Sequence, residues 1–135
     1  AQDGAEAAAT HVFTAADAVE FNPIEVPGFD SGMRIAVVHG DPGSEGDYTI
    51  RLSFPDGYRF PAHYHPKAEH VTVLEGTFLL AMGTSHDPAA IERYAPGAFL
   101  YIAPEHPHYG GAEGATTIQL HGEGPFDILL SDTEG

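Results

Sequence analysis

The chain has 135 residues, 42% of them hydrophobic, which suits one folded domain with a single core. It contains no cysteine, so disulfides, thiolate metal sites and a cysteine nucleophile are excluded. Twenty acidic residues against five basic ones give a formal charge of −15, which argues against binding to nucleic acid or anionic lipid.

The first ten residues, AQDGAEAAAT, are small and polar and lack the apolar segment of an intact signal peptide. Such a start is typical of the mature end that cleavage leaves. We therefore expect an exported protein, periplasmic or secreted, with a trimmed or frayed terminus of a cytoplasmic protein as the alternative. No apolar run reaches the roughly 18–20 residues that span a bilayer, so no membrane association is expected.

Glycine and proline divide the rest of the chain into many short segments, which is typical of an all-β sandwich or barrel. Residues 15–20 could form one helical turn, and residues 83–93 form a polar loop. The clearest strand pattern is the strict alternation of apolar and polar side chains from Tyr48 to Phe54. The predicted strands are 33–38, 48–54, 60–65, 70–74, 77–82, 98–102, 116–121 and 126–130. Turns are expected at 55–57, 75–76, 95–97 and 110–111.

One predicted hairpin carries an unusual number of metal-binding side chains. His63 and His65 share one strand face, because side chains at alternate positions point the same way. Two imidazole nitrogens in this arrangement can bind one metal ion, at about 2.0–2.2 Å each. Residues 66–68 form a short turn, after which Glu69 can add a carboxylate oxygen. Two histidines and a carboxylate leave coordination positions open, as in non-haem iron and related catalytic sites.

This spacing resembles the first motif of the cupin superfamily, G-x5-H-x-H-x3-E-x6-G, and the chain matches it in full. The matching residues are Gly57, His63, His65, Glu69 and Gly76.

The second cupin motif, G-x5-P-x-G-x2-H-x3-N, is matched in part. Gly97 matches, and His108 falls where the family has its fourth ligand. The departures are Ala103, Glu105 and Ala112, which put the local turn in doubt more than the ligand. An alternative is that His106 binds the metal and His108 does not.

The resemblance implies a single-domain, double-stranded β-helix barrel (jelly roll) with the metal inside, held by His63, His65, Glu69 and His108. It implies one divalent metal ion per chain, with iron or manganese favoured and zinc, nickel or copper also compatible with these ligands. The chain is also similar to small exported monocupins that carry Gly40-Asp41-Pro42 and Gly124-Pro125-Phe126.

The same resemblance sets the expected organisation of the chain. Residues 1–11 form a flexible arm, 12–46 strands that flank the barrel, 47–131 the barrel with its metal site, and 132–135 a tail. Dimers are common in the family, and an exposed sheet edge within residues 12–38 could pair with a second copy.

Five further residues are candidates for contact with a substrate: His106, Tyr101, Gln119, His121 and Arg51. His106 could act as an acid or base at the barrel mouth, or be an exposed loop histidine. Gln119 and His121, with Thr117, point either toward the metal or outward, with Ile118 and Leu120 in the core.

Tyr101 either orients a substrate or is a buried aromatic residue with its hydroxyl near a rim. Arg51, like Arg59, either binds a substrate carboxylate or forms a surface ion pair.

The predicted function is a metal-dependent enzyme that acts on a small molecule, with a dioxygenase-type oxidoreductase favoured. The alternatives are a non-catalytic module that binds a small molecule or a metal, and a non-redox cupin isomerase or lyase.

Overall fold

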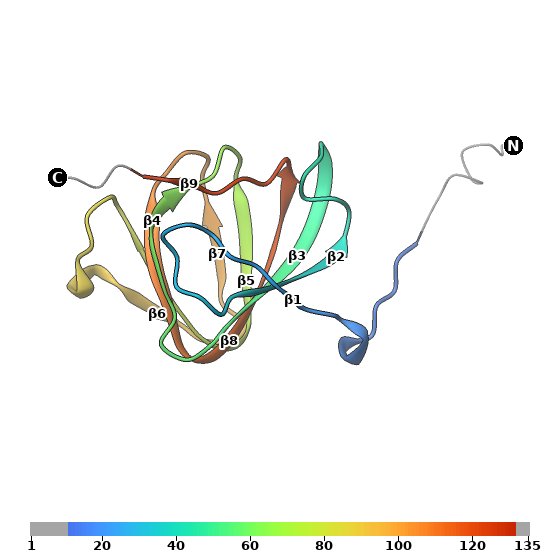
Figure 1. Ribbon diagram of the computed structural model, residues 1–135, viewed down its shortest axis with the longest axis horizontal. Helices are drawn as coiled ribbons and strands as arrows, with labels where there is room; N and C mark the ends of the chain where they lie inside the picture. The colour runs from blue at the N-terminus through green and yellow to red at the C-terminus, as the bar shows by residue number, and fades with distance from the viewer. Residues whose placement is uncertain (1–10, 132–135) are drawn as a thin grey trace, which may run out of the picture.

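The computed structural model describes residues 11–131, and this part of the chain consists almost entirely of antiparallel strands (Figure 1). The strands are β1 Asn22–Pro23, β2 Arg34–His39, β3 Gly46–Phe54, β4 Arg59–Tyr64, β5 Glu69–Met82, β6 Glu92–Tyr94, β7 Phe99–Ile102, β8 His108–Gly124 and β9 Leu129–Leu130. Two short 3-10 helices, η1 Ala16–Ala18 and η2 Pro88–Ala90, are the only helices described. None of the described helices has the length and hydropathy needed to cross a membrane.

The predicted all-β barrel is confirmed, and the long strand β8 organises it. The first residues of β8 pair with β4, and its second half pairs with β3. Strand β5 runs along nearly the whole of β8 on the other side and also pairs with β6 and β7. The sheet therefore curls around a common interior, as the ribbon shows (Figure 1). The expected arm, 1–11, and tail, 132–135, lie outside the described residues except for exposed His11.

The core fills the interior of the curled sheet, and the alternation seen in the sequence decides which side chains enter it. In β3, Tyr48, Ile50, Leu52 and Phe54 are all buried, whereas the residues between them are half-buried. The predicted strand 48–54 and its inward face are thus confirmed. Partner strands add further buried residues to the same cluster: Val71, Val73, Phe78, Leu80, Leu100, Ile102, Ile118 and Leu120.

The predicted turn at residues 75–76 is wrong, because β5 continues through it. The pairing of β5 with β8 shifts register on both sides of Glu75, so the strand carries an irregularity there instead of ending. Gly76 has a φ of 79°, and a β-carbon on it would overlap the carbonyl oxygen of Ala115 and the hydroxyl of Thr116. A left-handed glycine lets the strand bend at this point without breaking.

The predicted turn at residues 110–111 is also wrong, since Gly110 and Gly111 lie inside β8. Each glycine faces a neighbouring backbone, and a β-carbon on either would overlap a carbonyl oxygen, that of Leu79 for Gly110 and of Tyr58 for Gly111. The glycines allow close approach between strands here, and the sequence does not distinguish that role from a turn.

Two smaller differences concern the ends of elements. The predicted loop 83–93 ends in a strand, β6, which pairs with β5 through Phe78 and Tyr94. Its charged residues show no alternation, so the strand has no periodic signal. The predicted last strand, 126–130, is reduced to β9, because the backbone of Phe126 and Asp127 bonds to loop and side-chain groups instead of to a strand.

Candidate metal centre

Three strands deliver four side chains to one end of the barrel interior. His63 lies near the end of β4, and His65 follows directly after that strand. Glu69 is the first residue of β5, and His108 is the first residue of β8. His63 and His108 face each other in the β4–β8 pairing, so the two cupin-like motifs meet through sheet register.

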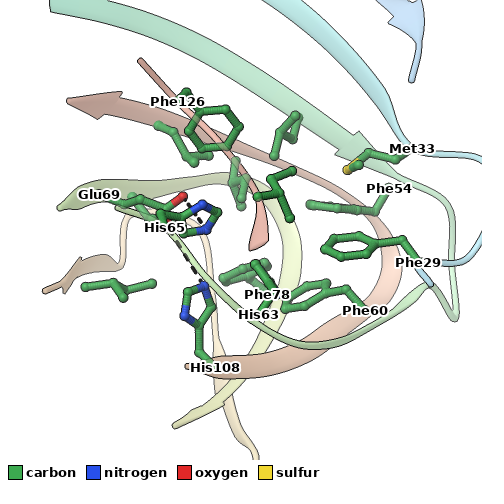
Figure 2. Close-up of a pocket in the computed structure, with 16 residues that line it drawn as sticks. Phe29, Met33, Phe54, Phe60, His63, His65, Glu69, Phe78, His108 and Phe126 are labelled. Atoms are coloured by element: carbon green, nitrogen blue, oxygen red, sulfur yellow. Dashed lines mark ion pairs between the residues drawn. The ribbon is translucent and has the colours of Figure 1, made fainter. Parts of the chain in front are cut away.

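The four side chains are buried and close together (Figure 2). One ring nitrogen from each of His63, His65 and His108 lies within 4.8 Å of those of the other two. A carboxylate oxygen of Glu69 lies 2.9 Å from Nε2 of His65, and the other lies 3.9 Å from Nε2 of His108. In residues 11–131, no other group of three such side chains lies as close.

Backbone carbonyls determine which nitrogen of each imidazole is free. Nδ1 of His63 lies 2.9 Å from the carbonyl oxygen of Pro61, Nδ1 of His65 lies 2.8 Å from that of Asp127, and Nδ1 of His108 lies 3.0 Å from that of His106. A carbonyl oxygen can only accept, so each Nδ1 must carry the proton and donate it. The lone pair of each neutral ring then lies on Nε2, which is the atom a metal would need.

This donor set fits a divalent metal ion. Three imidazole Nε2 atoms and one carboxylate are ligands accepted by iron, manganese, zinc, nickel and copper. A metal ion would also balance the negative charge of the Glu69 carboxylate, which is 3% exposed and so largely removed from water. The three histidines form the cluster that could hold a metal ion, and Glu69 lies beside it through His65 and His108. The geometry does not select among these metals.

Burial and neighbouring charges move the pKa values of the three histidines in different directions. Burial, together with His108 and His65, lowers the pKa of His63 to about 3. Burial also lowers the pKa of His108. Burial alone would lower the pKa of His65, but the hydrogen bond and charge of Glu69 outweigh it and raise the pKa. The raised pKa favours the protonated form of His65, whose Nε2–H would donate to Glu69, and metal binding at Nε2 would release that proton.

We expect metal-free protein to lose stability on acidification through His63. The unfolded chain has an ordinary histidine pKa of about 6.5, so between pH 6.5 and 3 it binds a proton that folded His63 does not bind. Stability therefore falls as pH falls through this window, and the contribution reaches about 2 kcal/mol at pH 5. His65 acts in the opposite sense, since its raised pKa gives stability that is lost as pH rises.

The measurement is urea unfolding of chelator-treated protein at pH 7.5 and pH 5, for the wild type and for His63→Gln. The difference between the two proteins in how much stability they lose at pH 5 separates the contribution of His63 from that of His65. An equal loss of stability in both proteins would contradict the assignment.

The turn before His108 forms in spite of its departures from the cupin motif. Glu105 stands at the position of the motif's glycine and has a φ of 65°, the only left-handed non-glycine backbone in residues 11–131. Its N–H donates to the carbonyl oxygen of His65 at 2.8 Å, which ties the second motif to the first. The backbone conformation that glycine favours is thus kept by a glutamate.

The structure separates His106 from His108. The His106 side chain is exposed, and its Nδ1 faces the carbonyl oxygen of Pro104 at 2.9 Å. His106 reaches the site only through its backbone carbonyl, which orients His108. The exposed-loop interpretation of His106 agrees with this placement.

The structure does not bring the other substrate candidates to the site, because alternation places them on the outer face of the sheet. Tyr101 is 57% exposed and packs edge-on to the ring of His70. His121 is exposed and stacks on His70, at 4.6 Å between ring centroids. Arg51 donates from Nε to the Gln119 side chain at 2.9 Å. Ile118 and Leu120, which alternate with Gln119 and His121 along β8, are buried instead. The interpretation in which Gln119 and His121 face outward is therefore the one observed.

A cavity of about 40 Å³ adjoins the four side chains (Figure 2). Barrel residues form much of its wall, but Phe29 and Phe126 come from segments outside the central strands. The ring of Phe29 lies 5.0 Å from that of His63, and the ring of Phe126 stacks on His65 at 5.1 Å. The sequence analysis missed both as site residues. For Phe126 the only signal was its place in the segment Gly124-Pro125-Phe126.

A family described as the ChrR cupin-like domain matches residues 9–89 of the chain. A search of curated proteins found no match. Solved structures share the fold at low sequence identity, so they support the architecture alone.

The polyketide cyclase RemF from Streptomyces resistomycificus is 15% identical with a TM-score of 0.75, over 93% of this chain and 88% of that one. A putative acetylacetone dioxygenase from Methylibium petroleiphilum PM1 is 18% identical with a TM-score of 0.71, over 93% and 85%. A cupin 2 conserved barrel domain protein from Rhodopseudomonas palustris is 16% identical with a TM-score of 0.70, over 91% and 87%.

Proposed function

Because the chain belongs to the ChrR cupin-like domain family, we propose that it is a metal-binding cupin that acts as a small-molecule metalloenzyme. His63, His65, Glu69 and His108 hold one divalent metal ion per chain. The observation that carries this proposal is the convergence of three imidazoles whose Nδ1 atoms all face backbone carbonyls, so that all three Nε2 atoms can turn their lone pairs to a metal once His65 has lost its second proton.

When bound, iron or manganese would supply Lewis-acid and redox chemistry toward dioxygen, and the dioxygenase-type reaction is the finer part of the proposal. The chain's own residues bind the metal and orient the small molecule. The three histidines and Glu69 hold the centre at one end of the cavity, and a small molecule with two adjacent oxygen atoms fits the open side. The aromatic walls at Phe29, Phe60 and Phe126 exclude bulk water from that side. Glu69 Oε2 lies 2.9 Å from His65 Nε2 and would accept a hydrogen bond from a protonated His65 when the centre is empty.

The structural neighbours support a small-molecule function without selecting the reaction. One is named a polyketide cyclase and another a putative acetylacetone dioxygenase, so proteins of this fold serve different reactions. The dioxygenase proposal rests on the donor set, in which two histidines and a carboxylate match non-haem iron ligation with a third histidine added.

A non-catalytic binding module is the second candidate, and the size of the cavity favours it. A space of about 40 Å³ beside a buried centre gives little room for two reactants unless Phe29 or Phe126 moves. A non-redox isomerase or lyase that uses zinc, nickel or manganese would share the same ligands.

The deciding experiment is metal analysis of protein purified without chelator or metal-affinity tag, together with oxygen uptake on a panel of catechols and diketones. About one iron or manganese per chain with substrate-dependent uptake supports the dioxygenase. One zinc, nickel or copper per chain without uptake supports the binding module or the non-redox enzyme. Protein that takes up no metal even after reconstitution contradicts the proposed centre.

Export is proposed separately, from the similarity to exported monocupins at Gly40-Asp41-Pro42 and Gly124-Pro125-Phe126, and homodimer formation from the sheet edge within residues 12–38. Neither depends on the metal centre. Cell fractionation of the native host protein tests the first, and light scattering of purified protein tests the second.

A further inference from the structure

The wall of the cavity beside the metal centre is apolar except for the proposed ligands. All other lining residues are aliphatic, aromatic or methionine: Phe29, Met33, Leu52, Phe54, Phe60, Val71, Phe78, Ile102, Ile118, Leu120, Phe126 and Ile128. No hydroxyl, amide or cationic side chain lines it. A bound molecule can therefore place polar atoms on the metal and nowhere else without leaving them unpaired.

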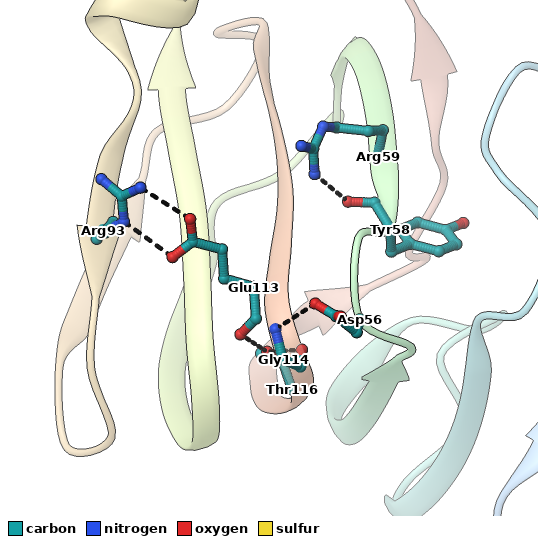
Figure 3. A network of polar contacts seen from close by, with 7 residues as sticks. All are labelled: Asp56, Tyr58, Arg59, Arg93, Glu113, Gly114 and Thr116. Atoms are coloured by element: carbon teal, nitrogen blue, oxygen red, sulfur yellow. Dashed lines mark hydrogen bonds and ion pairs between the residues drawn. The ribbon is translucent and has the colours of Figure 1, made fainter.

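All five basic residues of the chain lie within residues 11–131, and none of them is among the residues that line the cavity. Arg93 forms an exposed ion pair with Glu113, at 2.8 Å, and Arg59 donates to the Tyr58 carbonyl, at 3.1 Å (Figure 3). Arg34 donates to the carbonyl oxygen of Phe21, Arg51 donates to the side-chain oxygen of Gln119, and Lys67 donates to the carbonyl oxygen of Gly124. Within residues 11–131, the cavity wall therefore presents no lysine or arginine to pair with a second negative group of a ligand.

The net charge of the protein also disfavours a negatively charged ligand. The net charge of −15 disfavours the approach of anions, and salt screens this effect. The apolar wall and the negative field are independent observations that both disfavour a carboxylate-bearing ligand.

Phe126 is a lining residue of the cavity that lies directly against a proposed ligand. Its ring lies against both His65 and Tyr48, at 5.1 and 5.6 Å between centroids. Its backbone is tied down by a bond from its N–H to Pro42 O, and the next residue, Asp127, accepts from His65 Nδ1. Phe126 is partly exposed, so its side chain can be changed while these backbone contacts remain.

We propose that the site selects small oxygen chelators with short, uncharged apolar arms, and that it rejects chelators that carry a distal carboxylate. The metal is the sole polar anchor, and Phe126 sets the length of the arm. This inference rests on the proposed function, since it assumes a metal held by the four ligands.

The test is calorimetric binding to protein loaded with zinc, which avoids turnover. The probes are acetylacetone, butyrylacetone and succinylacetone. Succinylacetone differs from butyrylacetone by a carboxylate in place of the terminal methyl group, so the pair isolates charge from length. We expect acetylacetone to bind more tightly than butyrylacetone. Butyrylacetone should bind at least about tenfold more tightly than succinylacetone, because the carboxylate would be buried without a partner.

Two variants test the role of Phe126 directly. Phe126→Ala should favour butyrylacetone over acetylacetone, because the longer arm gains space. Phe126→Arg should raise succinylacetone affinity about tenfold, because it supplies the missing cation. Circular dichroism and zinc content confirm that both variants are folded and loaded.

Equal or tighter binding of succinylacetone to the wild type overturns the inference. So does the absence of diketone binding to protein that retains its zinc. Protein that retains no metal overturns the proposed function itself, which distinguishes the two failures.

Discussion

His108→Ala should lower metal affinity by at least about 100-fold, whereas His106→Ala should leave it nearly unchanged. The two histidines lie two positions apart in one loop, but only the ring of His108 reaches the centre. His106 contributes its backbone carbonyl to Nδ1 of His108, at 3.0 Å, and alanine retains that carbonyl. The pair is matched in residue type and sequence location but differs in burial as well as in ligation, so circular dichroism must show that His108→Ala is folded.

Affinity is measured by competition with a coloured chelator, and metal content is measured after desalting. His63→Ala should behave like His108→Ala, and His121→Ala, on the outer face, should behave like wild type. Loss of metal from His106→Ala with retention in His108→Ala would show that the second motif is displaced by two residues.

Gly110→Ala should destabilise the protein by about 3 kcal/mol. A β-carbon at Gly110 would overlap the carbonyl oxygen of Leu79 on the paired strand. Strands β5 and β8 would have to separate where they form the wall next to His108, so metal affinity should fall as well.

Gly43→Ala is the control, since a β-carbon there would lie 3.5 Å from the nearest atom, an Asp41 side-chain oxygen, in ordinary contact. Its effect should stay within about 1 kcal/mol. Urea unfolding followed by circular dichroism gives both values. A Gly110→Ala protein as stable as Gly43→Ala would show that the strands can move apart freely at this point.

The sequence alone predicted the barrel and the four side chains of the candidate site. Alternation over residues 48–54 was sufficient to place Tyr48 and Ile50 inside, because a half-buried strand has a period of two. The spacing of His63, His65 and Glu69 predicted their convergence for the same reason. His108 required the partial second motif, and the alternative at His106 was decided only by which ring is buried.

Sequence patterns failed where one residue type serves two purposes. Glycine at 76 and at 110–111 indicated turns, but these glycines let long strands bend and pack closely. Whether a glycine ends a strand or admits a neighbouring backbone depends on what lies opposite, and that is a property of the register.

By itself the sequence determined the all-β class, the inward face of the alternating strand 48–54 and the grouping of His63, His65 and Glu69, since these depend on local periodicity and residue type. The hairpin predicted around these three residues does not form, because β4 pairs with β8 and β9, and β5 pairs with β6, β7 and β8. Only the tertiary structure decided which carbonyl faces each imidazole, which placed the protons on Nδ1. It also decided that Gln119 and His121 point outward and that Phe29 and Phe126 close the cavity. These features join segments far apart in the chain, so no local pattern encodes them.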